Sequence, residues 1–301
     1  MTPAIMRTPA AEYLIRQRVS ALGRALPAAK AGDATSLHQA RVATRRLRAA
    51  LPLVASGPKA DKLARSVRRL TQALGPVREL DVELLILDEL DKSGDVPRAA
   101  VQRLRTSIVE ERRRLYSEVR DRIDDFDLEK VRKRALAVAR KCENAKGPRD
   151  RKGLAVARGR AARRAQRLAD AIENAAGLYL PDRLHQVRIA VKKLRYTLEL
   201  TQRPAASRPP ARIRTLKNAQ DLLGRMHDLE VLIARTRRIQ SSPGASTLQV
   251  SADLDRLVRR LENECRQLHG HYMASRGTLL SLCHRLIADR EPREHTRTSA
   301  A

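Results

Sequence analysis

Residues 37–51, LHQARVATRRLRAAL, return in the second half of the chain as residues 184–198, LHQVRIAVKKLRYTL. Eight of the fifteen positions are identical, and three more exchange Val for Ile or Arg for Lys. A random basic helix would keep its charge, but it would not keep this order of His, Arg and Leu. Similarity between distant segments indicates a duplicated structural unit. The sequence therefore predicts two related halves.

Each copy of this segment is expected to form an amphipathic helix. At ~100° per residue, its leucines and alanines form an apolar stripe that faces a core. Beside that stripe lies a row of four cationic or protonatable side chains in each copy: His38, Arg41, Arg45 and Arg48, and then His185, Arg188, Lys192 and Arg195. Arg46 and Lys193 fall on another side, where solvent is the expected neighbour. A solvated charged face is the simpler interpretation, but it has little reason to repeat its residue order, so we favour a ligand-binding row.

The chain is strongly basic, with 62 Lys and Arg residues against 34 Asp and Glu residues and a formal net charge of +28. Such a charge concentrates anions, so we expect a polyanionic partner such as polyphosphate, nucleic acid or an acidic surface. Single-stranded nucleic acids usually stack on aromatic rings, and this chain has one Phe, five Tyr and no Trp. The composition favours recognition of phosphates and leaves duplex nucleic acid as a non-specific electrostatic partner.

Cysteine usage and hydropathy bear on the compartment. Three widely spaced cysteines fit neither a disulfide framework nor a zinc knuckle, so we expect a reduced, cytoplasmic environment. No apolar run approaches the ~20 residues of a membrane span. The first residues lack the apolar stretch of a secretory signal. We therefore expect no membrane partner.

Almost the whole chain is expected to be helical, because Ala, Leu, Arg and Glu dominate and no alternating β-branched run occurs. Residues 144–153, rich in Gly, Pro and charge, predict the junction between halves. We therefore expect a single domain over residues 1–288, made of the repeats 9–146 and 147–288, with a flexible tail at 289–301. Further helices are predicted at 9–26, 58–73, 80–90, 97–123, 128–141, 154–176, 211–239 (interrupted near Gly224) and from about 247 to 288.

A second pair of matched segments supports the duplication. Residues 72–82, QALGPVRELDV, correspond to residues 221–231, DLLGRMHDLEV, with Leu-Gly, two carboxylates and a final Val in common. Gly75 and Gly224 are expected to kink their helices. Upstream of each glycine two basic residues lie one turn apart, which predicts a further basic row: Arg65 and Arg68 in the first copy, Arg214 and Lys217 in the second.

The carboxylates of this second motif allow a metal hypothesis, since paired carboxylates can hold Mg²⁺. We favour a simpler interpretation, in which Glu79, Asp81, Asp228 and Glu230 pair with the arginine rows or cap a helix. His269 and His271 lie two residues apart on a helix and face different directions, so they do not indicate a zinc site. The sequence thus predicts no metal and no cofactor.

The duplicated motifs, LHQ-x-R-[V/I]-x-x-[R/K]-[R/K]-LR and LG-x-x-x-[D/E]-x-[D/E]-V, resemble the CHAD family, the conserved histidine α-helical domain. The resemblance covers nearly the whole chain. It implies an all-α fold of two pseudo-symmetric antiparallel helical bundles packed around a shared basic groove or pore. It also implies binding of inorganic polyphosphate and association with polyphosphate granules. By position it assigns the ligand to the eight residues of the two His-containing rows and, less directly, to Arg65, Arg68, Arg214 and Lys217.

Catalysis is not part of this expectation. Many family members carry a strand-rich triphosphate tunnel domain with a Glu-x-Glu-x-Lys signature, and this chain has neither. It also lacks a P-loop and a concentrated acidic cluster. Two alternatives stay open: an enzyme or accessory subunit acting on phosphoanhydrides, and a basic protein that binds duplex nucleic acid. Polyphosphate binding would weaken with salt and with rising pH, because it depends on cations and protonated histidines.

Overall fold

The computed structural model describes residues 9–54, 57–143, 149–175, 177–199, 210–242 and 248–289. Every regular element in these ranges is an α-helix, which confirms the all-α fold class. The helices are α1 (Pro9–Lys30), α2 (Ala34–Val54), α3 (Pro58–Ser93), α4 (Arg98–Asp124), α5 (Leu128–Glu143), α6 (Arg149–Asn174), α7 (Pro181–Glu199), α8 (Ala211–Gln240) and α9 (Leu248–Ala288).

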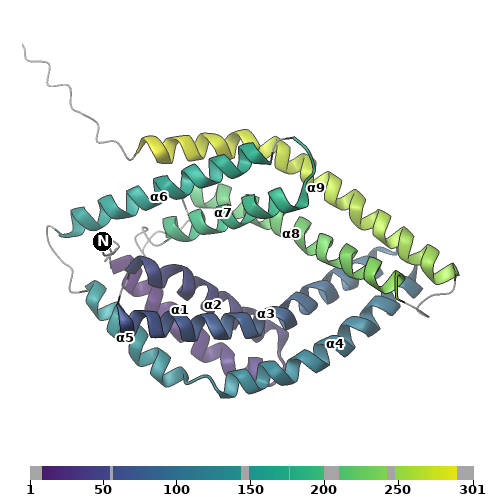
Figure 1. Ribbon diagram of the computed structural model, residues 1–301, viewed down its shortest axis with the longest axis horizontal. Helices are drawn as coiled ribbons and strands as arrows, with labels where there is room; N and C mark the ends of the chain where they lie inside the picture. The colour runs from purple at the N-terminus through teal and green to yellow at the C-terminus, as the bar shows by residue number, and fades with distance from the viewer. Residues whose placement is uncertain are drawn as a thin grey trace, which may run out of the picture.

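The helices of each half pack in chain order. In the first half α1 contacts α2, α2 contacts α3 and α3 contacts α4, while α5 returns to α1. In the second half α6 contacts α7, α7 contacts α8 and α8 contacts α9, while α9 returns to α6 (Figure 1). Each half has its own buried aliphatic cluster of Leu, Ala, Val and Ile side chains. Aliphatic side chains make up most of both clusters, and Tyr272 is a fully buried aromatic residue of the second one.

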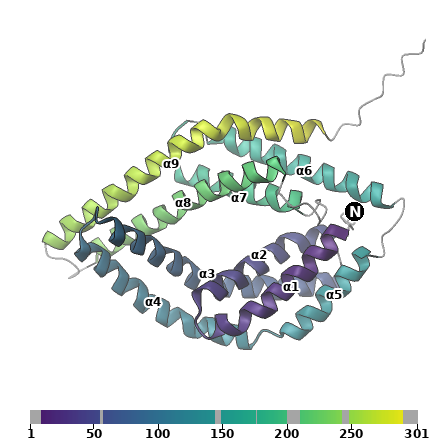
Figure 2. The same cartoon turned by 180° about the vertical axis from the view of Figure 1, so that it is seen from behind.

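In the described residues the two halves meet mainly where α2 packs on α7, α3 on α8 and α4 on α9. A third apolar cluster combines side chains of α3 and α4 with side chains of α8 and α9. Beside it Arg235 of α8 pairs with Glu83 of α3 and lies 2.5 Å from Glu111 of α4. Both views show α2 and α3 facing α7 and α8 across the centre of the molecule (Figures 1 and 2).

Glycine and proline interrupt the helices less than the sequence predicts. Helix α3 runs without a break through Gly75 and Pro76, and α8 runs through Gly224, so the predicted interruptions are wrong. Helix α1 likewise passes Pro27 and ends at Lys30. A proline inside a helix removes one hydrogen bond. Burial of neighbouring residues such as Leu74 and Val77 offsets that cost in α3.

The segment predicted as the junction is partly helical, because α6 begins at Arg149. Residues 144–148 and nearly all of the predicted tail, 290–301, lie outside the described residues. In the part of the chain that the structure covers, no helix combines the length and the apolar character needed to cross a bilayer.

Candidate functional site

The two repeated His-containing helices face one cavity. This cavity, called the basic cavity below, has a volume of about 740 Å³ and lies between α2 and α3 on one side and α7 and α8 on the other. Seven of the eight residues in the two predicted rows line it: His38, Arg41, Arg45, Arg48, His185, Arg188 and Lys192. The fold therefore brings together side chains that are about half a chain apart in the sequence.

Arg195, the eighth member, does not line the basic cavity. Its side chain is buried, with Nη1 2.6 Å from Glu199 and Nε donating to Gln220 at 3.1 Å. Its guanidinium lies 4.9 Å from the ring centre of Tyr196, which does line the cavity. We predicted that Arg195 faces the ligand, but it instead supports Tyr196 in the cavity wall.

The second predicted row also lies away from the basic cavity. Arg65, Arg68, Arg214 and Lys217 are exposed and are not among the cavity-lining residues. Lys217 pairs with Asp221 at 2.6 Å. Arg68 is close enough to Arg48 to contribute, after burial and Arg45, to the lowered pKa of Arg48. These residues add to the surrounding positive field without forming the wall.

Four basic residues of the basic cavity were not predicted: Arg78, His227, Arg164 and Lys193. Arg78 and His227 each lie three residues after the motif glycine, so the aligned second motif held a signal for them. Arg164 belongs to the arginine-rich α6 and gave no such signal. Its Nη1 donates to the Lys193 carbonyl at 2.6 Å. Lys193, expected in solvent, contributes to the wall although it is largely exposed.

Two carboxylates accompany the two rows at matching positions. Arg41 Nη2 lies 3.7 Å from Glu79, and Arg188 Nη2 lies 4.0 Å from Asp228. Both separations exceed direct hydrogen-bonding distances. The carboxylates therefore balance charge while leaving donors of the guanidinium groups for an anion.

The other two predicted carboxylates have different partners. Asp81 accepts from Arg112 Nε at 2.7 Å, and Glu230 accepts from the Tyr179 hydroxyl at 2.7 Å. In the covered part of the chain no group of three or more His, Cys, Asp or Glu residues is arranged to hold a metal ion.

The motif glycines lie beneath the arginines of the two rows. A Cβ atom at Gly75 would come 3.2 Å from Arg41 Nη1, which donates to the Thr71 carbonyl at 3.1 Å. A Cβ atom at Gly224 would lie 4.0 Å from Arg188 Nε, an ordinary contact. At Gly75 the absent side chain thus gives Arg41 room to lie against α3.

We expect Gly75→Ala to weaken anion binding about fivefold, because the added Cβ atom displaces the Arg41 guanidinium from its position against α3. The fold should not be destabilised, because alanine favours a helix over glycine by ~1 kcal/mol. The measurement is polyphosphate affinity together with urea unfolding. Gly224→Ala is the matched control and should keep the wild-type affinity, since its Cβ has ordinary clearance. Equal losses of affinity in both variants would show that the contact with Arg41 is not the cause.

The cationic groups of the basic cavity repel one another strongly. Burial, followed by the charges of Arg188 and Arg45, lowers the pKa of Lys192 from 10.5 to about 6. Burial, followed by Arg188, His185 and Lys192, lowers the pKa of His227 to about 4. The His185 and His227 rings are 4.8 Å apart. Because Arg45 comes from the first half, the lowered pKa of Lys192 also shows that both rows share one electrostatic environment.

The pKa values of the other two histidines of the basic cavity are lowered as well. Burial, then Arg78 and Arg45, lowers the pKa of His38. Burial, then Arg188 and Lys192, lowers the pKa of His185. Burial and the neighbouring cations thus favour the neutral form of both rings.

The chain is similar to known proteins in both sequence and structure. The CHAD domain family model matches residues 13–237, about three quarters of the chain. The crystal structure of the CHAD domain from the plant Ricinus communis is similar, with a TM-score of 0.62 and 20% identity, covering 94% of this chain and 93% of that one. PptA from Streptomyces chartreusis gives a TM-score of 0.57 and 18% identity, covering 90% of this chain and 99% of that one. No curated protein matches by sequence.

Proposed function

This chain belongs to the CHAD domain family, a family associated with polyphosphate, and from that premise we propose that it binds inorganic polyphosphate in the basic cavity without catalysing its turnover. The observation that carries the proposal is the convergence of seven side chains from the two repeated rows on one cavity. We further propose that binding takes place in the cytoplasm, on polyphosphate granules.

The chemistry of polyphosphate suits such a cavity. The polymer offers only negative charge and phosphate oxygens, with no bases to read. Arginine stays charged and donates two parallel hydrogen bonds to a phosphate group. Side chains three or four residues apart on a helix are ~5–6 Å apart, so each row can follow a flexible phosphate chain. Rows on α2 and α7 would hold the chain from two sides.

Binding would be coupled to protonation. Lys192 titrates near pH 6 in the free protein, and a phosphate chain beside it would return its pKa toward 10.5. Between these two values the complex holds more protons than the free protein. The lowered pKa values of His38 and His185 imply that these two side chains also take up protons when polyphosphate binds. Polyphosphate would therefore supply the negative charge that this cavity lacks when empty.

The affinity for polyphosphate is expected to fall as pH rises above about 6, by up to about tenfold per pH unit for each proton taken up. Calorimetric titration at about pH 7.5 in two buffers of different protonation enthalpy measures this uptake directly. The same titrations in rising salt should show a steep loss of affinity. Heats that are independent of the buffer, with a dissociation constant that is flat from about pH 6.5 to 8.5, would contradict the proposal.

Simple assays distinguish the proposed function from two others, an enzyme of phosphoanhydride metabolism and a binder of duplex DNA. An enzyme acting on phosphoanhydrides would release phosphate when incubated with polyphosphate and Mg²⁺, and we expect none. A duplex DNA binder is favoured by the net charge of +28. At physiological salt we expect polyphosphate to displace DNA, because the aligned donors lie inside a cavity rather than on an open surface. Preference for DNA would favour that second function.

A further inference from the structure

A second cavity adjoins the basic cavity. This α3–α4 pocket has a volume of about 670 Å³ and lies between α3, α4 and the beginning of α2. It shares His38 and Arg78 with the basic cavity. Its volume is within the ~300–1,000 Å³ usual for small-molecule sites. A phosphate group held by the two shared residues could therefore belong to a ligand that extends into the α3–α4 pocket.

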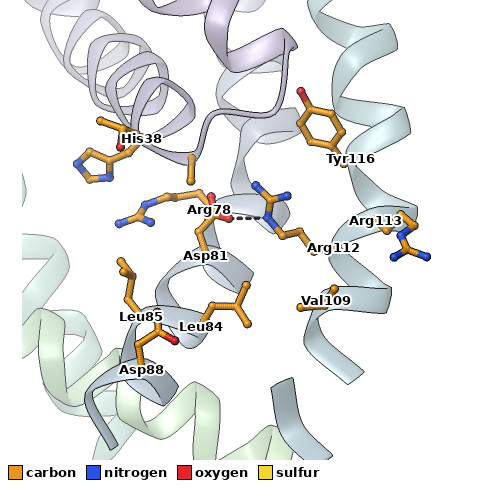
Figure 3. A pocket seen from close by; sticks show the side chains of 12 residues that line it. His38, Arg78, Asp81, Leu84, Leu85, Asp88, Val109, Arg112, Arg113 and Tyr116 are labelled. Carbon is orange, nitrogen blue, oxygen red and sulfur yellow. Dashed lines mark hydrogen bonds and ion pairs between the residues drawn. The ribbon is translucent and has the colours of Figure 1, made fainter. Parts of the chain in front are cut away.

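The walls of the α3–α4 pocket are suited to an apolar or aromatic group. Leu84 and Val109 face each other across the space between α3 and α4, and Tyr116 lies further along α4 (Figure 3). Leu85 and Val109 are 53% and 39% exposed, so both offer apolar surface to a ligand in this pocket. The same pocket is also lined by the basic residues His38, Arg78, Arg112 and Arg113, which can hold phosphate groups. A bare phosphate chain would leave the apolar side chains without a partner. They instead favour a ligand that carries a ring as well as phosphates.

A buried carboxylate in this pocket lacks one partner. Asp81 is only 4% exposed, and its Oδ1 accepts a hydrogen bond from Arg112 Nε at 2.7 Å (Figure 3). Its other oxygen, Oδ2, is buried without a hydrogen-bond partner in the part of the chain that the structure describes. A buried acceptor left unsatisfied is costly. A ligand with a hydroxyl or amino donor would satisfy it.

The second half contains such a group at the matching position. Glu230 corresponds to Asp81 and accepts a hydrogen bond from the Tyr179 hydroxyl at 2.7 Å. Tyr179 lies six residues before His185, and the residue six positions before His38 is Gly32. The second half thus provides an aromatic ring with a hydroxyl donor from its own chain. The first half has glycine there, and Tyr116, which lines its pocket, donates its hydroxyl to the carbonyls of Ala29 and Lys30 rather than to Asp81.

We propose that the α3–α4 pocket binds the nucleoside part of a nucleoside polyphosphate whose phosphate groups reach His38 and Arg78. The ring would lie between Leu84, Leu85 and Val109. A ribose hydroxyl or an amino group of the base would donate to Asp81 Oδ2. The inference rests on the proposed function, because the same two basic residues border the basic cavity. It adds nucleoside polyphosphates to the ligand proposed above, long-chain polyphosphate.

Paired titrations with ATP and tripolyphosphate test this inference on the full chain. Both ligands have three phosphates, and ATP carries less negative charge, so charge alone favours tripolyphosphate. We expect ATP to bind about tenfold more tightly because its ring is buried. In the variant Leu85→Gln/Val109→Gln, the affinity for ATP should fall to that for tripolyphosphate, while the affinity for tripolyphosphate stays within about twofold.

The matched control is Leu178→Gln/Leu248→Gln, which changes two apolar side chains that are 68% and 93% exposed and lie outside both cavities. It should keep the preference for ATP. The inference is overturned if wild-type protein binds ATP no more tightly than tripolyphosphate, or if the preference survives in Leu85→Gln/Val109→Gln. Failure to bind long-chain polyphosphate as well would overturn the proposed function itself.

Discussion

Replacing Arg45 and Arg188 together by glutamine is expected to lower the affinity for long-chain polyphosphate at least about a hundredfold, because each hydrogen bond between charged groups contributes ~1.5–3 kcal/mol. The two arginines come from opposite halves and line the same cavity. Among the described residues Arg45 makes a long contact, 3.5 Å, with the Tyr196 hydroxyl, and Arg188 pairs loosely with Asp228 at 4.0 Å. Their removal should therefore cost little folding stability, which thermal unfolding can verify.

The matched control for this variant is Lys133→Gln/Arg259→Gln. Both residues are exposed and absent from the basic cavity, and the double change removes the same net charge. We expect this control to lower the affinity only about twofold, by weakening general attraction. A similar loss in both double variants would mean that net charge, rather than the basic cavity, determines binding.

The second large effect concerns Lys192, where stability and binding should change in opposite directions. Its pKa is about 6 in the folded protein, well below the ordinary value of 10.5. At pH below 6 the folded state carries the full cost of a buried, repelled cation, and this cost disappears as pH rises toward 10.5. Lys192→Met removes that cost. Near neutral pH we expect the variant to be ~2 kcal/mol more stable, after allowance for solvent screening.

Binding should show the opposite result, with Lys192→Met losing about tenfold or more in affinity for polyphosphate. Urea unfolding at about pH 6.5 and 9.5 measures the stability effect, which should shrink at the higher pH. Lys193→Met is the neighbouring control for the stability effect, since the Lys193 side chain is largely exposed. If Lys192→Met destabilises the protein at the lower pH, Lys192 is a structural residue rather than a group held ready for an anion.

The sequence was sufficient to predict the helical class and seven of the eleven His, Arg and Lys residues that line the basic cavity. The repeated order of His, Arg and Leu places Arg41 and Arg188 on equivalent faces, and the structure directs both into one cavity. Arg195 shares that periodicity but is buried against Glu199. Angular position on a helix does not reveal which neighbouring helix covers its end, so Arg195 could not be distinguished from Arg48.

The other differences come from tertiary packing. Propensity predicts a break at Gly75 and Pro76, but burial on both sides keeps α3 continuous, and the glycine serves Arg41 instead. Arg164 enters the cavity because α6 packs on α7. In an arginine-rich helix no periodic signal marks that one residue. The unpartnered Oδ2 of Asp81 could not be predicted either. Only the structure shows that Tyr179 donates to Glu230, whereas Tyr116 donates to main-chain carbonyls.

The central claim is that basic side chains from both halves hold one polyphosphate chain between them. A crystal structure with a short-chain polyphosphate tests it most directly, by the position of the phosphorus atoms. We expect an ordered chain in the basic cavity, with phosphate oxygens accepting hydrogen bonds from Arg45 of α2 and Lys192 of α7. A chain bound to the outer surface of one half, with the basic cavity empty, would contradict the claim.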